Sequence, residues 1–281
     1  MLKNSSKLRD KLYIIKKNVI PRVKYLELLS RGPRPIIYLE KRLVLFWSAK
    51  ADCTFSVKWM FAQMGVLEEI ERKHNWLHNY RAKFYYGSSQ HELGLYHLIR
   101  NSGSFYLIKV VDDPFKRAVR SYIHACIYTF EDSNLTAFLH REVNPQNRFS
   151  FREFAQYLSS IDITKCDLHL RCQISEIEKY RKFREMHIIK LDNSMEDIKY
   201  LEKSRNLKEI NLDPLRISQH HRPKYKTTEF VGDKIMNEIH GIKNATIPEY
   251  KQFYDEEIKE RIAKIYLRDF ERYNFDTKFK L

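Results

Sequence analysis

Three short apolar runs predict buried β-strands, and each is followed by a segment of helical periodicity. The runs are Leu43–Trp47 (LVLFW), Phe105–Val111 (FYLIKVV) and His187–Leu191 (HIIKL). Continuous apolar runs of this length are typical of strands that are buried on both faces. Strands that alternate with helices predict an α/β domain with a central, mostly parallel sheet flanked by helices.

The helical pattern is clearest after the second strand. Apolar side chains recur from Phe115 to Ile127 at steps of three and one, which places them on one helix face. Asp113 suits the N-cap of this helix and Pro114 its first turn. Further helices are expected from Thr54 onward and over residues 66–86, 150–160, 195–204 and 253–273.

The pattern divides the chain into two parts. Residues 1–42 form a basic extension that is predicted to be helical or irregular, and residues 43–281 form a single α/β domain. The extension could pack on the domain as a helix or lie on a membrane surface as a weak amphipathic helix. No run approaches the ~20 apolar residues of a membrane span. No targeting segment is visible, so the cytoplasm is the expected location.

The charge balance points to an anionic partner. Lys and Arg number 51 against 36 Asp and Glu, a net charge of +15. This excess suits phosphate, sulfate, an acidic glycan, nucleic acid or an anionic membrane surface. The charges are dispersed and no nucleic-acid motif is present, which disfavours nucleic acid.

The cysteines do not predict a metal site. Four cysteines in 281 residues are ordinary usage for a reducing compartment. Cys166, His169 and Cys172 match no standard zinc spacing, and no fourth ligand is evident. We therefore expect no metal.

The first strand, the loop after it and the next helix form a pattern typical of anion sites. In such an arrangement the loop amides and the helix N-terminus direct their donors at one spot. Neither GxxxxGK[ST] nor GxGxxG occurs, which disfavours kinases, ATPases and NAD enzymes.

The same segment, SAKADCTFSVK, resembles the 5′-phosphosulfate loop of sulfotransferases, in their carbohydrate-sulfotransferase-like branch. Lys50, Cys53 and Thr54 fall at matching positions. VVDDPFKRAVRSYIHA resembles the family's 3′-phosphate segment. Four stretches resemble further family segments in the right order, so that the resemblance covers residues 43–276: NWLHNYRAKFYY, CDLHLRCQ, HIIKLDNSMEDIKYL and FYDEEIKERIAKIYLRDFERYNFD.

The resemblance implies a P-loop-like α/β fold and transfer of a sulfuryl group without a metal. The donor would be 3′-phosphoadenosine 5′-phosphosulfate (PAPS), and the acceptor a hydroxyl or amine, most often on a sugar. Lys50 would neutralise charge on the leaving phosphate. The backbone amides that would hold the 5′-phosphosulfate belong to Cys53, Thr54, Phe55 and Ser56.

The resemblance also implies a base for the acceptor hydroxyl, commonly a histidine between the two cofactor segments. The candidates are His74, His78, His91 and His97. NWLHNYRAKFYY resembles a Trp-x-His-x-Tyr-Arg pattern of bacterial-type members, which favours His78, with His91 next. His220 and His221 lie in a basic loop that could contact an anionic acceptor or simply be exposed.

Three positions depart from the family pattern, all at the expected cofactor site. Asp52 replaces a glycine, Asp112 replaces the arginine expected at the 3′-phosphate, and Arg120 replaces a serine, with Ser121 next to it. Asp52 could cap the following helix itself. Arg120 and Ser121 could hold the 3′-phosphate, or Arg120 could pair with Asp112 and close the site. The alternative function is therefore a catalytically impaired member that binds an anionic partner.

Overall fold

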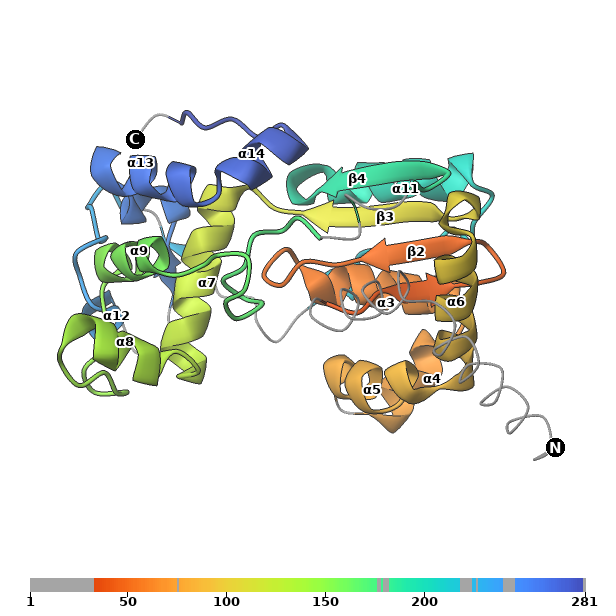
Figure 1. Ribbon diagram of the computed structural model, residues 1–281, viewed down its shortest axis with the longest axis horizontal. Helices are drawn as coiled ribbons and strands as arrows, with labels where there is room; N and C mark the ends of the chain where they lie inside the picture. The colour runs from red at the N-terminus through yellow and green to blue at the C-terminus, as the bar shows by residue number, and fades with distance from the viewer. Residues whose placement is uncertain are drawn as a thin grey trace.

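The computed structural model describes residues 33–74, 76–175, 178, 182–217, 224–225, 227–239 and 246–279. A four-stranded sheet has the order β1–β2–β3–β4 (Figure 1). The pairs β2–β3 and β3–β4 are parallel, and β1 is antiparallel to β2. The predicted mixed α/β class and the three predicted strands are confirmed, with ends shifted by no more than two residues. The strands are β1 (Ile36–Tyr38), β2 (Leu43–Phe46), β3 (Tyr106–Val111) and β4 (Glu185–Lys190).

Strand β1 lies in the range that was predicted to be a helical or irregular extension. Ile36 and Ile37 are fully buried, and Ile37 pairs with Val44 of β2. A strand of three residues is too short to show a periodicity, so its pairing partner determines its structure. Residues 1–32 of the predicted extension lie outside the described residues.

Two layers of helices cover the sheet. Leu43 and Leu45 of β2 pack in one apolar cluster with α3 and α11, whereas Val44 and Phe46 pack in another with α6. The predicted helix over 66–86 is divided into α4, α5 and a 3₁₀ turn (Tyr85–Gly87). The helices of these layers are α3 (Cys53–Gln63), α4 (Leu67–Lys73), α5 (Leu77–Lys83), α6 (Ser89–Arg100) and α11 (Ser194–Ser204).

A second group of helices gathers beyond one edge of the sheet, on the left of Figure 1. Its own apolar core centres on the fully buried Tyr122 of α7, whose ring meets those of Phe149, Phe151 and Phe253. The group consists of α7 (Pro114–Tyr128), α8 (Asp132–Leu139), α9 (Phe151–Ser160), α12 (Met236–Ile239) and α13 (Glu256–Ile265), with a small parallel pair of strands, β5 (Lys224–Tyr225) and β6 (Ile247–Pro248).

One predicted helix start is confirmed, and one predicted helix is divided into two. Asp113 caps α7 by accepting hydrogen bonds from the amides of Phe115 and Lys116, as predicted. The apolar stripe over 253–273 is not one helix, because the backbone at Tyr266 leaves the helical region between α13 and α14 (Leu267–Tyr273). No helix among the described residues is long and apolar enough to cross a membrane.

The sheet topology brings two sequence segments to one place. Because β2 and β3 are parallel, their carboxyl ends meet at the same edge of the sheet, where α/β proteins commonly bind ligands. The loop over residues 47–52 follows β2, and the Asp112–Asp113 pair follows β3. Both segments therefore lie between the sheet and α7.

Candidate functional site

The loop over residues 47–52, called the cradle loop below, leads directly into α3. Lys50 and Asp52 both have left-handed backbones, with φ of 66° and 47°. Glycine adopts this conformation most readily, and aspartate is among the few other residues that tolerate it. Asp52 thus keeps the backbone shape expected of the family's glycine. Its side chain does not cap α3, so the predicted self-capping is wrong.

The start of α3 presents fewer donors than the sequence predicted. The first amides of a helix have no partner within it, which leaves those of Cys53, Thr54 and Phe55 for a ligand. Ser56 is different, because its amide donates to the Asp52 carbonyl at 3.3 Å and its hydroxyl to the Cys53 carbonyl at 3.2 Å. Ser56 is also fully buried, which disfavours its predicted role in cofactor binding.

A buried arginine holds the cradle loop in place. The Nε of Arg117 donates to the Ala49 carbonyl at 2.9 Å, and its Nη2 donates to the Arg171 carbonyl at 2.6 Å. Arg117 is 1% exposed. Arg117 lies within VVDDPFKRAVRSYIHA, the stretch that resembles the family's 3′-phosphate segment, and the sequence predicted no role for it. Its contacts identify it as a support for the loop.

Gln173 joins the carboxyl end of β3 to the C-terminal helix. Its side-chain amide exchanges two hydrogen bonds with the backbone of Asp112, at 2.9 and 2.8 Å. Its backbone amide donates to the carboxylate of Asp269, which is fully buried on α14. The Ser48 hydroxyl of the cradle loop donates to the Gln173 carbonyl at 3.4 Å. One residue therefore positions both segments that the sequence predicted to bind the cofactor.

Helix α5 brings His78 to the start of α3. The Nε2 of His78 lies 3.0 Å from Oγ1 of Thr54, at hydrogen-bond distance. Both residues were singled out from the sequence, and the structure places them together at the helix end. The ring of Trp76 meets that of His78 edge-on, with 5.4 Å between centroids. A histidine in this position can take a proton from a group that approaches the cradle.

The other candidate histidines have different surroundings. His91 is 1% exposed on α6, and its ring packs against Tyr85 and Tyr86. Burial, with a contribution from the charge of Arg34, lowers the pKa of His91 to about 4. The ring is therefore a neutral part of the core rather than an accessible base. His97 lies on α6 beside Tyr96. His220 and His221 lie outside the described residues.

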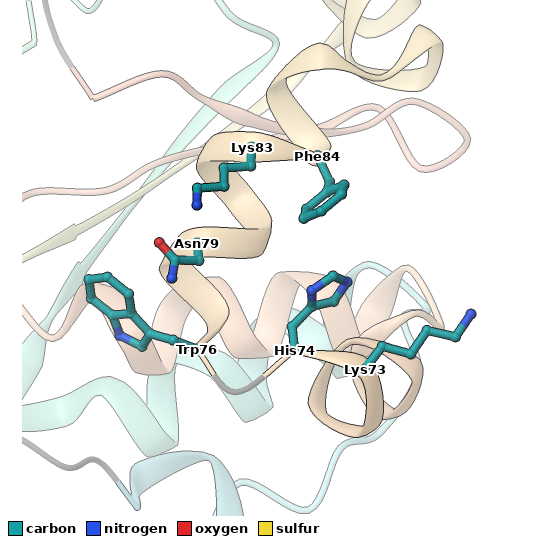
Figure 2. Close-up of a pocket in the computed structure, with 6 residues that line it drawn as sticks. All are labelled: Lys73, His74, Trp76, Asn79, Lys83 and Phe84. Atoms are coloured by element: carbon teal, nitrogen blue, oxygen red, sulfur yellow. The ribbon is translucent and has the colours of Figure 1, made fainter.

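A groove of about 300 Å³ lies along α5 (Figure 2). Trp76, Asn79 and Lys83 line it on one side, and on the other it is lined by Lys73, His74 and Phe84. Trp76 and Phe84 are about half exposed, at 47% and 53%. Since Trp76 also contacts His78, the groove begins beside the cradle. It combines exposed aromatic faces with positive charges.

The second cofactor segment contains an ion pair. The guanidinium of Arg120 pairs with Oδ2 of Asp112, as one of the two sequence-based alternatives predicted. Asp112 is 1% exposed, and its Oδ1 accepts no hydrogen bond from the described residues. Arg120 keeps part of its surface in solvent. Ser121 is fully buried and donates to the His169 carbonyl at 2.7 Å, which disfavours its predicted contact with the 3′-phosphate.

We expect Asp112 to make stability depend on pH. Burial raises the pKa of its carboxyl to about 6 from 3.8, although the charge of Arg120 opposes this shift. The folded protein then binds a proton more readily than the unfolded chain, so this contribution is greatest at low pH and falls as the pH rises through 6. Between pH 4.5 and 7, the unfolding free energy of the parent should therefore fall by about 2 kcal/mol more than that of Asp112→Asn.

Urea denaturation at the two pH values measures this difference. Asp213→Asn, which changes an exposed carboxyl, is the matched control and should keep the pH dependence of the parent. Equal losses in the parent and in Asp112→Asn would show that Asp112 does not titrate in this range.

The described residues contain no group of three or more His, Cys, Asp or Glu side chains that could hold a metal ion. Cys166 and Cys172 form no disulfide in the part of the chain that the structure describes, and His169 Nδ1 lies 2.7 Å from the carboxylate of Asp167.

Comparison with known proteins gives one match. A family model described as "Sulfotransferase family" matches residues 40–276, a range that contains β2, the cradle loop, α5, α7 and α14. Neither the curated proteins nor the solved structures give a match.

Proposed function

Because this chain belongs to the sulfotransferase family, we propose that it transfers a sulfuryl group from PAPS to a hydroxyl group of a carbohydrate. Three observations support this proposal: the helix start that follows β2, the lysine in the cradle loop, and a histidine at hydrogen-bond distance from Thr54. The contact between His78 and Thr54 carries the most weight, since it joins a base to an anion site.

In this reaction the acceptor oxygen attacks sulfur, and the bond from sulfur to the bridging oxygen of the 5′-phosphate breaks. The Nε2 of His78 exchanges its contact with Thr54 for the acceptor hydroxyl and takes the proton of that hydroxyl. Lys50 neutralises the charge that develops on the leaving phosphate, and the amides of Cys53, Thr54 and Phe55 hold the 5′-phosphosulfate. Such transfer depends on positioning and on charge stabilisation rather than on a covalent intermediate. The product is adenosine 3′,5′-bisphosphate.

The acceptor would lie in the groove beside His78. The faces of Trp76 and Phe84 offer flat apolar surfaces to sugar rings, and Lys83 suits an acid group on the same chain, whereas Lys73 is paired with Glu69. The net charge of +15 agrees with an anionic donor and an anionic glycan.

Calorimetric titration with adenosine 3′,5′-bisphosphate tests the cofactor site. We expect Asp52→Gly to bind this product about tenfold more tightly than the parent, because it removes a carboxylate beside the phosphate and suits a backbone with φ of 47°. Asp52→Asn separates the two causes, since asparagine also tolerates a left-handed backbone but carries no charge. Failure of both the parent and Asp52→Gly to bind the product would contradict the proposed donor.

The ion pair of Asp112 with Arg120 favours a second candidate function. An arginine already paired with a buried carboxylate is a weaker partner for a 3′-phosphate. A member of the family with its cofactor site closed in this way would bind an anionic partner without catalysis. Binding of the product by Asp52→Gly but not by the parent would support this function over sulfuryl transfer.

A further inference from the structure

Arg81 is a buried cation at the cradle that the proposed mechanism does not use. Arg81 is 9% exposed. It lies on the side of α5 that also carries His78. Its Nε and Nη1 atoms are buried and have no hydrogen-bond partner among the described residues. A buried guanidinium left without partners is costly, so native proteins rarely keep one without a reason.

The surroundings of Arg81 hold it beside the start of α3. Its guanidinium carbon lies 3.9 Å from the centroid of the Trp47 ring, in the cradle loop. A guanidinium over an indole face is attracted to the ring while its N–H groups stay free to donate at the edges. Burial raises the pKa of the Cys53 thiol, whereas the charges of Arg81 and Lys50 lower it. Two cations therefore act on the first residue of α3.

We propose that Arg81 binds an oxyanion at the cradle, and that this oxyanion is the sulfonate group of the donor. The inference rests on the proposed function. His78 and Arg81 are three residues apart and so share one side of α5. A base must reach the attacking hydroxyl, and that hydroxyl must reach sulfur. A group beside the base therefore lies nearer to the sulfonate than to the nucleotide.

The chemistry of the sulfonate suits this position. Its three oxygens accept hydrogen bonds, and a guanidinium supplies planar paired donors that a lysine cannot reproduce. Lys50 would act on the leaving phosphate from the loop, and Arg81 on the transferred group from α5. Two cations would then divide the charge of the phosphosulfate between them.

The test compares two nucleotides that differ by the sulfonate. The parent, Arg81→Gln and Arg81→Lys are titrated by calorimetry with PAPS and with adenosine 3′,5′-bisphosphate. We expect Arg81→Gln to weaken PAPS binding by about tenfold or more and to leave the affinity for the bisphosphate within about twofold. Arg268→Gln removes the same charge from an exposed position on α14, and should match the parent. Equal weakening for both nucleotides, or for neither, would overturn the assignment.

Two further measurements keep the test decisive. The thermal unfolding midpoint shows whether each variant folds. If Arg81→Gln does not, Arg81→Lys carries the comparison, because it keeps the charge and loses the paired donors. If the parent binds neither nucleotide, the proposed function fails. The oxyanion site is then tested alone, by comparing the thermal unfolding midpoint in sodium sulfate with that in sodium chloride of equal ionic strength. If sulfate raises the midpoint of Arg268→Gln but not that of Arg81→Gln, the oxyanion site at Arg81 is upheld. If sulfate raises the midpoint of both variants, the site is overturned.

Discussion

Replacing Lys50 by alanine is expected to lower the rate of sulfuryl transfer by roughly 10²–10³, equivalent to about 3–4 kcal/mol of barrier. The physical reason is the loss of the positive charge that faces the leaving phosphate. Because this charge matters most in the transition state, the effect should fall on kcat more than on KM. Steady-state rates with PAPS and a glycan acceptor measure it.

The backbone of Lys50 requires a second variant. With φ of 66° lysine already bears the strain of a Cβ in the left-handed region, and alanine bears the same strain, so a variant that relieves it tests the backbone separately. Lys50→Asn removes the charge and tolerates the left-handed backbone. Both variants should lose the same activity if the charge is responsible. Recovery in Lys50→Asn would instead assign the loss to the backbone. Lys199→Ala, on the exposed face of α11, is the control for removal of a lysine.

Replacing His78 by alanine is expected to lower kcat by roughly 10²–10⁴, the usual range for loss of a general base. A protonated imidazole cannot accept the proton of the hydroxyl, so the parent should lose activity on the acid side of its pH profile. The variant should lack this acid limb. Both quantities come from rates measured across pH.

A structural role for His78 predicts different results. The contact with Thr54 also holds α5 on α3, and its loss alone would lower stability without changing the form of the pH profile. Added imidazole should restore part of the rate in His78→Ala if the ring acts as the base, but it cannot repair packing. His97→Ala, on α6, should behave as the parent. An unchanged acid limb in His78→Ala would exclude this base.

The elements that carry long apolar patterns could be predicted from the sequence. The run from Leu43 and the stripe that begins at Phe115 each fix one strand or one helix, because burial of a continuous face leaves few alternatives. Strand β1 and the break at Tyr266 could not be predicted in this way. Strand β1 pairs with the neighbouring β2 but is too short to show a periodicity of its own, whereas Tyr266 donates to the carbonyl of Leu170, which is distant in the chain.

In the candidate site, too, some residues could be predicted from local sequence and others could not. Thr54, His78 and the alternatives for Arg120 followed from motif positions, since the spacing of residues about a helix start is local. The roles of Arg117, Gln173 and Arg81 did not. Each depends on which backbone carbonyl, carboxylate or ring the fold brings to its side chain, and a single sequence does not specify those contacts. The surroundings of Ser56 and Ser121 could not be predicted for the same reason, because carbonyls that the fold brings near them accept hydrogen bonds from their hydroxyl groups.

The hydrogen bonds between Gln173 and Asp269 set an order for the assembly of this protein on the ribosome. Asp269 lies in α14, 96 residues after Gln173. Until that helix emerges, the backbone amide of Gln173 lacks its buried carboxylate, and the segment that positions Asp112 and contacts Ser48 lacks this anchor. A nascent chain that already contains Lys50, His78 and Arg81 would therefore still lack a fully formed site, and would acquire it only after α14 has emerged.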